Sequence, residues 1–203
     1  MSIIGALVLG LGLGLRHATD ADHIVVLSGL VQRERGVASV ARVAAAWGLG
    51  HSVTFFGVGL AIVVFGLSLP AAFEPFAESV VAAMLIGIGA WHLLRTHPRV
   101  DMTGSPLSIA RPMAVGLVHG LAGSAPIALM ALATMPTRAV AVTYLVLFAL
   151  GTIVGMVLFT MVITRPLAWL RRGERFDSVM RMGAGALSVL LGVVMAIERF
   201  RDR

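Results

Sequence analysis

The sequence predicts an all-α, polytopic membrane protein with six transmembrane helices arranged as two inverted three-helix repeats. Its 203 residues are 58% hydrophobic and only 13% charged, with a mean hydropathy of +0.95, whereas charged residues make up about a quarter of a soluble domain. Long apolar segments follow one another along the chain, and related short sequences occur in its two halves. Because the bilayer core offers no water to backbone groups, such segments should be helices.

Six apolar segments are candidates for crossing a bilayer, which takes roughly 20 residues. They cover 3–31, 39–69, 76–94, 113–135, 139–163 and 176–198. The first segment lacks a basic n-region and a small-residue cleavage site, so we expect it to be retained as a span rather than removed as a signal peptide. All six belong to one predicted transmembrane domain over 1–203, with repeat 1 at about 1–100 and repeat 2 at about 101–203.

Arginines gather in alternate connections between these segments. Eleven lie in the first, third and fifth connections or just beyond them in the next segment: Arg33, Arg35, Arg42, Arg95, Arg99, Arg111, Arg165, Arg171, Arg172, Arg175 and Arg181. Arg138 alone lies in the fourth, and the second has none. Because basic loops favour the cytoplasm, we expect a multi-pass protein of the cell membrane with both termini outside, although the arginine-rich tail opposes this orientation. The net charge of +6 therefore indicates orientation in a lipid bilayer rather than nucleic-acid binding.

The repeat rests on three short matches that fall in the same order, one in each pair of spans. The matching pairs are 14–17 with 116–119 at an offset of 102, 49–50 with 150–151 at 101, and 85–88 with 190–193 at 105. A unit of three spans crosses the membrane an odd number of times, so its second copy is inverted. Inverted repeats are common in secondary transporters, where the binding site lies at the repeat interface.

A polar motif interrupts the first apolar segment. Arg16–Ile24 reads RHATDADHI and contains His17, Asp20, Asp22 and His23. Ionisable groups inside a membrane are costly and persist mainly where they face a pathway or a ligand. Imidazole and carboxylate groups together suit a divalent transition metal. The alternative is a self-satisfied polar network that only fixes helix packing.

The spacing of this motif favours a broken helix. On an ideal helix, which advances about 100° per residue, His17, Asp20 and His23 fall within an arc of about 120° and Asp22 points away from it. Asp22 could instead hold a histidine tautomer from outside the ligand shell. We favour unwinding between Ala18 and Asp22, because broken helices form binding sites at the bilayer midplane.

Two histidines outside this motif are further candidates for the site. His51 in the second span is a candidate metal ligand, with a lone histidine bonded to a carbonyl as the alternative. His119 is the repeat equivalent of His17, so we expect it to face the same cluster from the other half. The carboxylates have no repeat equivalents, which predicts an asymmetric site. Five further residues are expected to have roles other than metal binding. His92 should lie at the membrane interface and His97 in a solvated loop, and the Ser124 hydroxyl should bond within its helix. Trp47 and Trp169 should be packing or interface residues.

Two sequence elements resemble the nickel/cobalt transporter (NiCoT) family of membrane permeases. They are HxxxxDH within RHATDADHI and the LGHSV sequence of Leu49–Val53. Where long members carry further acidic, threonine-rich motifs, this chain has GLVHGLAGS at Gly116–Ser124. That variant resembles the short six-span members often found near urease accessory genes. The resemblance implies passage of nickel or cobalt, and it strengthens the assignment of His51.

The residues and the resemblance together predict transport of a divalent transition-metal cation, nickel or cobalt, most simply uptake. The metal ligands expected are His17, Asp20, Asp22, His23, His51 and His119. The metal is a substrate, and no prosthetic group or enzymatic activity is expected. The chain has no cysteine and no GxGxxG or Walker pattern, which excludes thiolate ligands, a dinucleotide site and an ATPase. Efflux of the same cations and an intramembrane metal-dependent hydrolase are the alternatives, and a homo-oligomer is left open.

Overall fold

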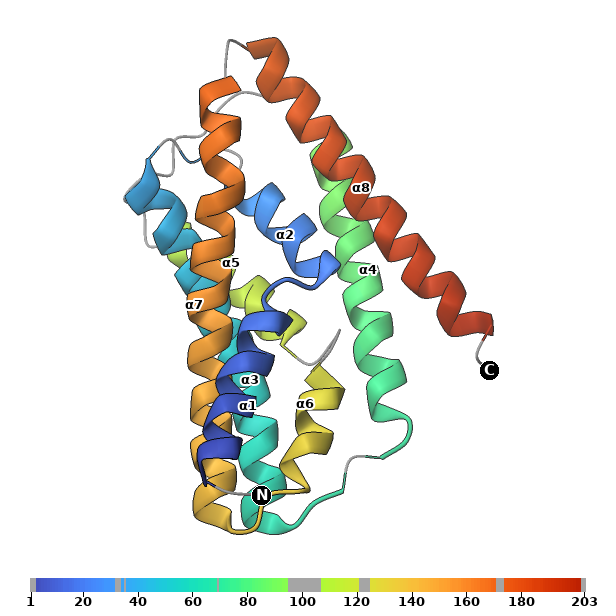
Figure 1. Cartoon of the computed structure of the whole chain (residues 1–203). Coiled ribbons are helices and arrows are strands. Elements are labelled where there is room, and N and C mark those ends of the chain that lie inside the picture. The colour runs from blue at the N-terminus through green and yellow to red at the C-terminus, as the bar shows by residue number, and fades with distance from the viewer. Residues whose placement is uncertain are drawn as a thin grey trace.

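The computed structural model describes residues 3–31, 34, 36–68, 70–94, 107–120, 125–170 and 174–201, and within them all regular structure is α-helical (Figure 1). The helices are α1 (Ile3–His17), α2 (Ala21–Val31), α3 (Val37–Phe65), α4 (Phe73–Leu94), α5 (Leu107–His119), α6 (Ala125–Leu132), α7 (Arg138–Leu170) and α8 (Glu174–Arg201). The all-α prediction is confirmed.

Four of the described helices, α3, α4, α7 and α8, are long and apolar enough to cross a membrane. The pair α1 and α2 qualifies as a fifth, broken span, because the two helices pass the test together and are bent by 58°. The fourth predicted span, 113–135, falls on α5 and α6, which have 13 and 8 residues and are each too short to cross alone. A multi-pass membrane protein is therefore supported, with four to five spans counted among the described residues.

Element boundaries differ from the predicted ones most at the end of α7, which runs to Leu170 rather than to residue 163, and at the start of α5. The sequence pattern places the start of this span after Pro112, whereas α5 begins at Leu107 and carries Pro112 within it. Proline removes one backbone hydrogen bond, but membrane helices tolerate it where neighbouring groups satisfy the freed carbonyl. Hydropathy therefore located the apolar part of this helix and missed its first turn and a half.

The helices form two groups. In the larger group, α1 packs against α7, α5 packs against α3, and α3 packs against α7. The smaller group is the pair α4 and α8, which lie side by side and lean away from the larger group in Figure 1. The short helix α2 contacts α8, α3, α7 and α4. It therefore connects the two groups at the level of the polar motif.

Glycines allow the closest helix crossings in the larger group. A Cβ atom on Gly14 of α1 would overlap the backbone carbonyl of Phe148 on α7. Likewise, a Cβ atom on Gly116 of α5 would overlap the backbone carbonyl of Trp47 on α3. Small residues at such positions let membrane helices approach backbone to backbone. Both crossings lie within one turn of a histidine that ends its helix, so they fix where His17 and His119 emerge.

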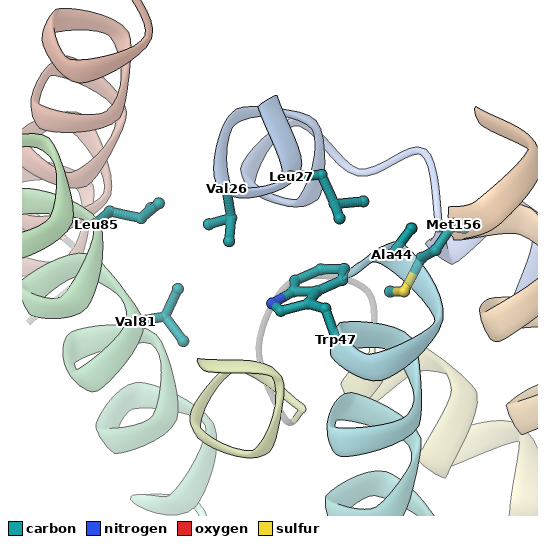
Figure 2. Close-up of a cluster of buried hydrophobic side chains, with 8 residues drawn as sticks. Val26, Leu27, Ala44, Trp47, Val81, Leu85 and Met156 are labelled. Carbon is teal, nitrogen blue, oxygen red and sulfur yellow. The ribbon is translucent and has the colours of Figure 1, made fainter. Parts of the chain in front are cut away.

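A buried apolar cluster lies where α2, α3, α4 and α7 meet. Its fully buried members include the indole of Trp47, and Figure 2 shows this ring surrounded by side chains from all four helices: Val26, Leu27, Ala44, Val81, Leu85 and Met156. The cluster adjoins the polar motif through Trp47, so it closes one side of that motif against solvent and lipid.

Candidate metal centre

The break between α1 and α2 separates the two histidines of the motif onto different helices. The N–H groups of Thr19 and Asp20 donate to the carbonyls of Arg16 and His17 at 2.9 and 3.1 Å, which closes the end of α1. The carbonyl of Asp20 then accepts from the N–H of Ile24 at 3.1 Å and starts α2. The predicted break is confirmed, although it covers 18–20 and leaves Asp22 in the first turn of α2.

Four histidines from four helices meet at this break. His17 ends α1, His23 lies in α2, His51 lies in α3 and His119 ends α5, and all four are fully buried. The ring of His23 is central, with centroid distances of 4.6 Å to His17, 4.9 Å to His51 and 5.0 Å to His119. The sequence therefore predicted correctly that His119 faces the cluster from the second half of the chain.

Three short polar contacts organise the outer members of this cluster. His17 Nε2 lies 2.7 Å from His51 Nε2, so one of these nitrogens donates and the other accepts. His119 Nε2 lies 2.7 Å from a carboxylate oxygen of Asp22. His17 Nδ1 lies 3.0 Å from a carboxylate oxygen of Asp20. Because a carboxylate accepts the Nδ1 proton of a neutral imidazole, Asp20 favours the tautomer of His17 that keeps its Nε2 lone pair inward.

Both carboxylates of the motif contact a histidine nitrogen. The alternative drawn from the sequence had Asp22 hold a histidine tautomer, and Asp22 does lie at Nε2 of His119, while Asp20 lies at Nδ1 of His17. The side chain of Asp20 is 21% exposed, whereas that of Asp22 is 8% exposed. Asp22 instead points inward and meets His119 of the other half.

Several buried nitrogens of the cluster have no hydrogen-bond partner among the described residues. They are both ring nitrogens of His23, Nδ1 of His51, Nδ1 of His119 and Nε1 of Trp47. A buried polar atom without a partner costs about 1–3 kcal/mol. An unpaired imidazole nitrogen has either a lone pair, which can bind a metal ion, or a proton, which can be donated to a water molecule.

Two overlapping sets of side chains have the geometry of a metal site. In His17, His23 and His51, and again in Asp22, His23 and His119, one potential ligand atom from each residue lies within 4.8 Å of the others. Metal–nitrogen bonds are about 2.0–2.1 Å long, so ligand atoms around one ion lie at most about 4.2 Å apart. Small side-chain rotations would bring either set onto an ion.

The C-terminal ends of α1 and α5 add partial negative charge, which is the sign that a cation needs. Both α1 and α5 end at a histidine of the cluster, and the carbonyls at the C-terminal end of a helix carry partial negative charge. The N-terminal end of α2 carries partial positive charge, which favours the Asp22 carboxylate in its first turn. Broken helices in transporters use their ends in this way around ions.

Sequence reasoning missed the contribution of two aromatic rings. Trp47 lies edge-on to His23 at a centroid distance of 5.1 Å and is 5.6 Å from both His51 and His119. Phe148 lies 5.4 Å from His17 on the other side. Trp47 and Phe148 differ by 101 in number, so the offset of the repeat could have found the pair. Trp47 does pack as expected, but it packs on the histidines.

Of the other residues singled out in the sequence, His92 is the one whose side chain the structure describes away from the cluster. The ring of His92 on α4 lies beside Gly29 of α2, where a glycine Cβ would come within 2.8 Å of the imidazole. His97, Ser124 and the side chain of Trp169 lie outside the described part of the chain.

The chain resembles known proteins over almost its whole length. A relative from Bacillus sp. (strain TB-90), named urease accessory protein UreH, is 26% identical over 209 residues, covering 95% of this chain and 91% of the relative. No solved structure matches the chain. The sequence profile of the HupE / UreJ protein family matches residues 3–199, so this protein belongs to the HupE/UreJ family.

Proposed function

We propose that this protein carries a divalent transition-metal cation, nickel or cobalt, across the membrane in the direction of uptake. The observation that carries the proposal is the convergence of four buried histidines and a buried aspartate from α1, α2, α3 and α5. A set of this size inside an apolar helical protein is expensive unless it serves a ligand or pathway.

The donor atoms set the class of substrate. Imidazole nitrogen with carboxylate oxygen suits nickel, cobalt, zinc and copper, while alkali and alkaline-earth ions prefer oxygen alone. Affinity order does not distinguish nickel from cobalt. The resemblance of RHATDADHI to NiCoT permeases, and the name of the urease accessory relative, favour these two metals over the others.

The architecture supports alternating exposure of the site by two inverted halves. The contact of Gly14 with the Phe148 carbonyl and that of Gly116 with the Trp47 carbonyl are equivalent under the repeat, since the glycines differ by 102 and their partners by 101. Counting α5 and α6 as one further broken span gives the six crossings expected from the sequence. Sites between inverted repeats are a known basis for alternating access.

Membrane potential is a sufficient driving force for uptake. Moving one charge through 100 mV is worth about 2.3 kcal/mol, so a 2+ ion gains about 4.6 kcal/mol. The sequence contains no Walker pattern, and none is needed for accumulation at this scale.

Metal accumulation in cells tests the proposal. Cells expressing the protein should accumulate nickel or cobalt, and His17→Ala and His23→Ala should abolish this accumulation while the protein still reaches the membrane. His92→Ala is the matched control, because it removes a histidine outside the cluster and should transport normally. Near-normal uptake by well-expressed His17→Ala and His23→Ala variants would refute the proposal, and depletion of metal from expressing cells would indicate efflux instead.

A further inference from the structure

The five buried ligands divide into two sets that share one residue. The first set is His17, His23 and His51, and the second is Asp22, His23 and His119. We propose that the transported ion occupies two alternative positions, one in each set, and that His23 passes it from one to the other. This inference rests on the transport function proposed above.

The contacts within the cluster already separate the two positions. His17 and His51 are joined at 2.7 Å on one side, and Asp22 and His119 are joined at 2.7 Å on the other. Each pair offers two donor atoms that lie close together and would part to admit an ion. No set of mutually close ligand atoms among the described residues contains members of both pairs.

His23 is placed to serve either pair. Its ring lies between them, with centroids 4.6 and 4.9 Å from the first pair and 5.0 Å from His119. Neither of its ring nitrogens has a hydrogen-bond partner among the described residues, although the side chain is fully buried. It can therefore turn from one position to the other without breaking a hydrogen bond that the described residues provide.

The two positions differ in charge. The first offers three neutral imidazoles, whereas the second includes the buried carboxylate of Asp22. A dication buried away from water is stabilised strongly by an anionic ligand, so the ion should rest at the Asp22 position at equilibrium. The three-histidine position is then the one that the ion passes through before it reaches the Asp22 position. Its His17 contacts Asp20, which is the more exposed of the two aspartates.

Sharing His23 also limits occupancy to one ion. Two dications held only a few ångströms apart in a buried site would repel each other strongly, and each would need the same imidazole. Transfer is therefore a movement of one ion between alternative positions, not the filling of a two-metal centre.

Cobalt binding to the purified full chain in detergent tests this division. Visible absorption of Co²⁺ reports its ligand set, and equilibrium titration gives stoichiometry and affinity. We expect one Co²⁺ per chain in the wild type. His51→Ala should keep the wild-type spectrum and an affinity within about threefold while losing most uptake, because the Asp22 position remains and the other is incomplete.

His119→Ala should behave differently, because it damages the resting position. We expect at least about a tenfold loss of affinity and a changed spectrum as the ion moves to the three histidines. His23→Ala should lose binding at both positions. His92→Ala should match the wild type in spectrum and affinity. The glutamine variants His51→Gln and His119→Gln repeat the comparison with less loss of side-chain volume, in case an alanine variant does not fold.

Three results would overturn the division into two positions. These are equal losses of affinity with the same spectral change in His51→Ala and His119→Ala, normal uptake by His51→Ala, or two Co²⁺ per wild-type chain. A wild type that neither binds nor accumulates cobalt or nickel would instead remove the proposed function itself. Cobalt binding at one site that needs all five ligands would refute the two alternative positions and leave the transport function standing.

Discussion

At the scale of residues, two aspartates two positions apart have separate partners. Asp20 lies in the break between α1 and α2 and contacts His17 of its own half. Asp22 lies two residues further, in the first turn of α2, and contacts His119 of the second half of the chain. The difference follows from local backbone: the break turns Asp20 toward the end of α1, and the helix directs Asp22 into the core.

The two carboxylates should therefore differ in their effect on binding. Asp22→Asn removes the buried negative charge beside the ion, so it should abolish uptake and weaken equilibrium binding at least about tenfold, with the ion left at the three histidines. Asp20→Asn removes the group that orients His17, which belongs to the position that the ion crosses, so it should reduce uptake while changing the equilibrium affinity by less than about threefold, as His51→Ala does. Isothermal titration of both variants with Ni²⁺ measures the difference. A larger loss in Asp20→Asn than in Asp22→Asn would reverse the assignment of the two roles.

Metal binding should weaken in acid. A histidine must be neutral to coordinate a metal, so protons compete with the ion for the cluster. Lowering the pH from about 7.5 to 5.5 carries it through the usual titration range of histidine, and the apparent Ni²⁺ affinity of the purified protein should fall. Affinity that stays constant over this range would mean that carboxylates alone hold the ion.

At the scale of elements, the cluster depends on where two short helices end. α1 and α5 each end at a buried histidine, and each crosses a long partner helix at a glycine one turn earlier. Backbone contact at that glycine sets the depth at which the histidine emerges, so the crossing and the ligand position are coupled.

Enlarging the crossing glycine should destabilise the protein. Gly14→Ala places a methyl group against the Phe148 carbonyl, and overpacking of this kind costs about 1–3 kcal/mol. Gly12→Ala on the same helix is the matched control, because a Cβ there meets nothing within 4 Å. Thermal unfolding in detergent should show a lower midpoint for Gly14→Ala only. Equal midpoints for the two variants would mean that α1 and α7 do not cross as closely as described.

At the scale of the whole molecule, two features concern how the chain sits in the membrane. The described helices form a group of α1, α3, α5 and α7 and a separate α4–α8 pair, and α2 links the two while contributing Asp22 and His23 to the cluster. The second feature is the placement of arginines in alternate connections, which predicts the side of the membrane that each connection faces.

Both termini should lie outside the cell. The expectation rests on eleven arginines in alternate connections against one in the others. The chain contains no cysteine, so single-cysteine labelling has no background. Glu74→Cys, at the start of α4, should react with an impermeant reagent in intact cells, and Gly36→Cys, before α3, should react only after lysis. The reverse pattern would show that the orientation is inverted.

The sequence by itself determined the apolar helices, the position of the break and the residue types of the candidate site. These follow from local properties of the sequence. One segment is enough to show its hydropathy, the spacing of His17, Asp20 and His23 around a helix, and the cost of burying these three residues. The repeat offset extended this expectation to His119, on the premise that equivalent positions of two inverted halves would lie near a common axis.

Only the tertiary structure decided which groups face each other across helices. That Asp22 meets His119, that His17 meets His51, and that Trp47 covers three imidazoles depends on how closely α1, α3, α5 and α7 cross. Those crossings are set by backbone contacts at glycines such as Gly14 and Gly116, between segments far apart in the chain. Local periodicity carries no information on such distances, so the division of the cluster around His23 could be seen only once the helices were packed.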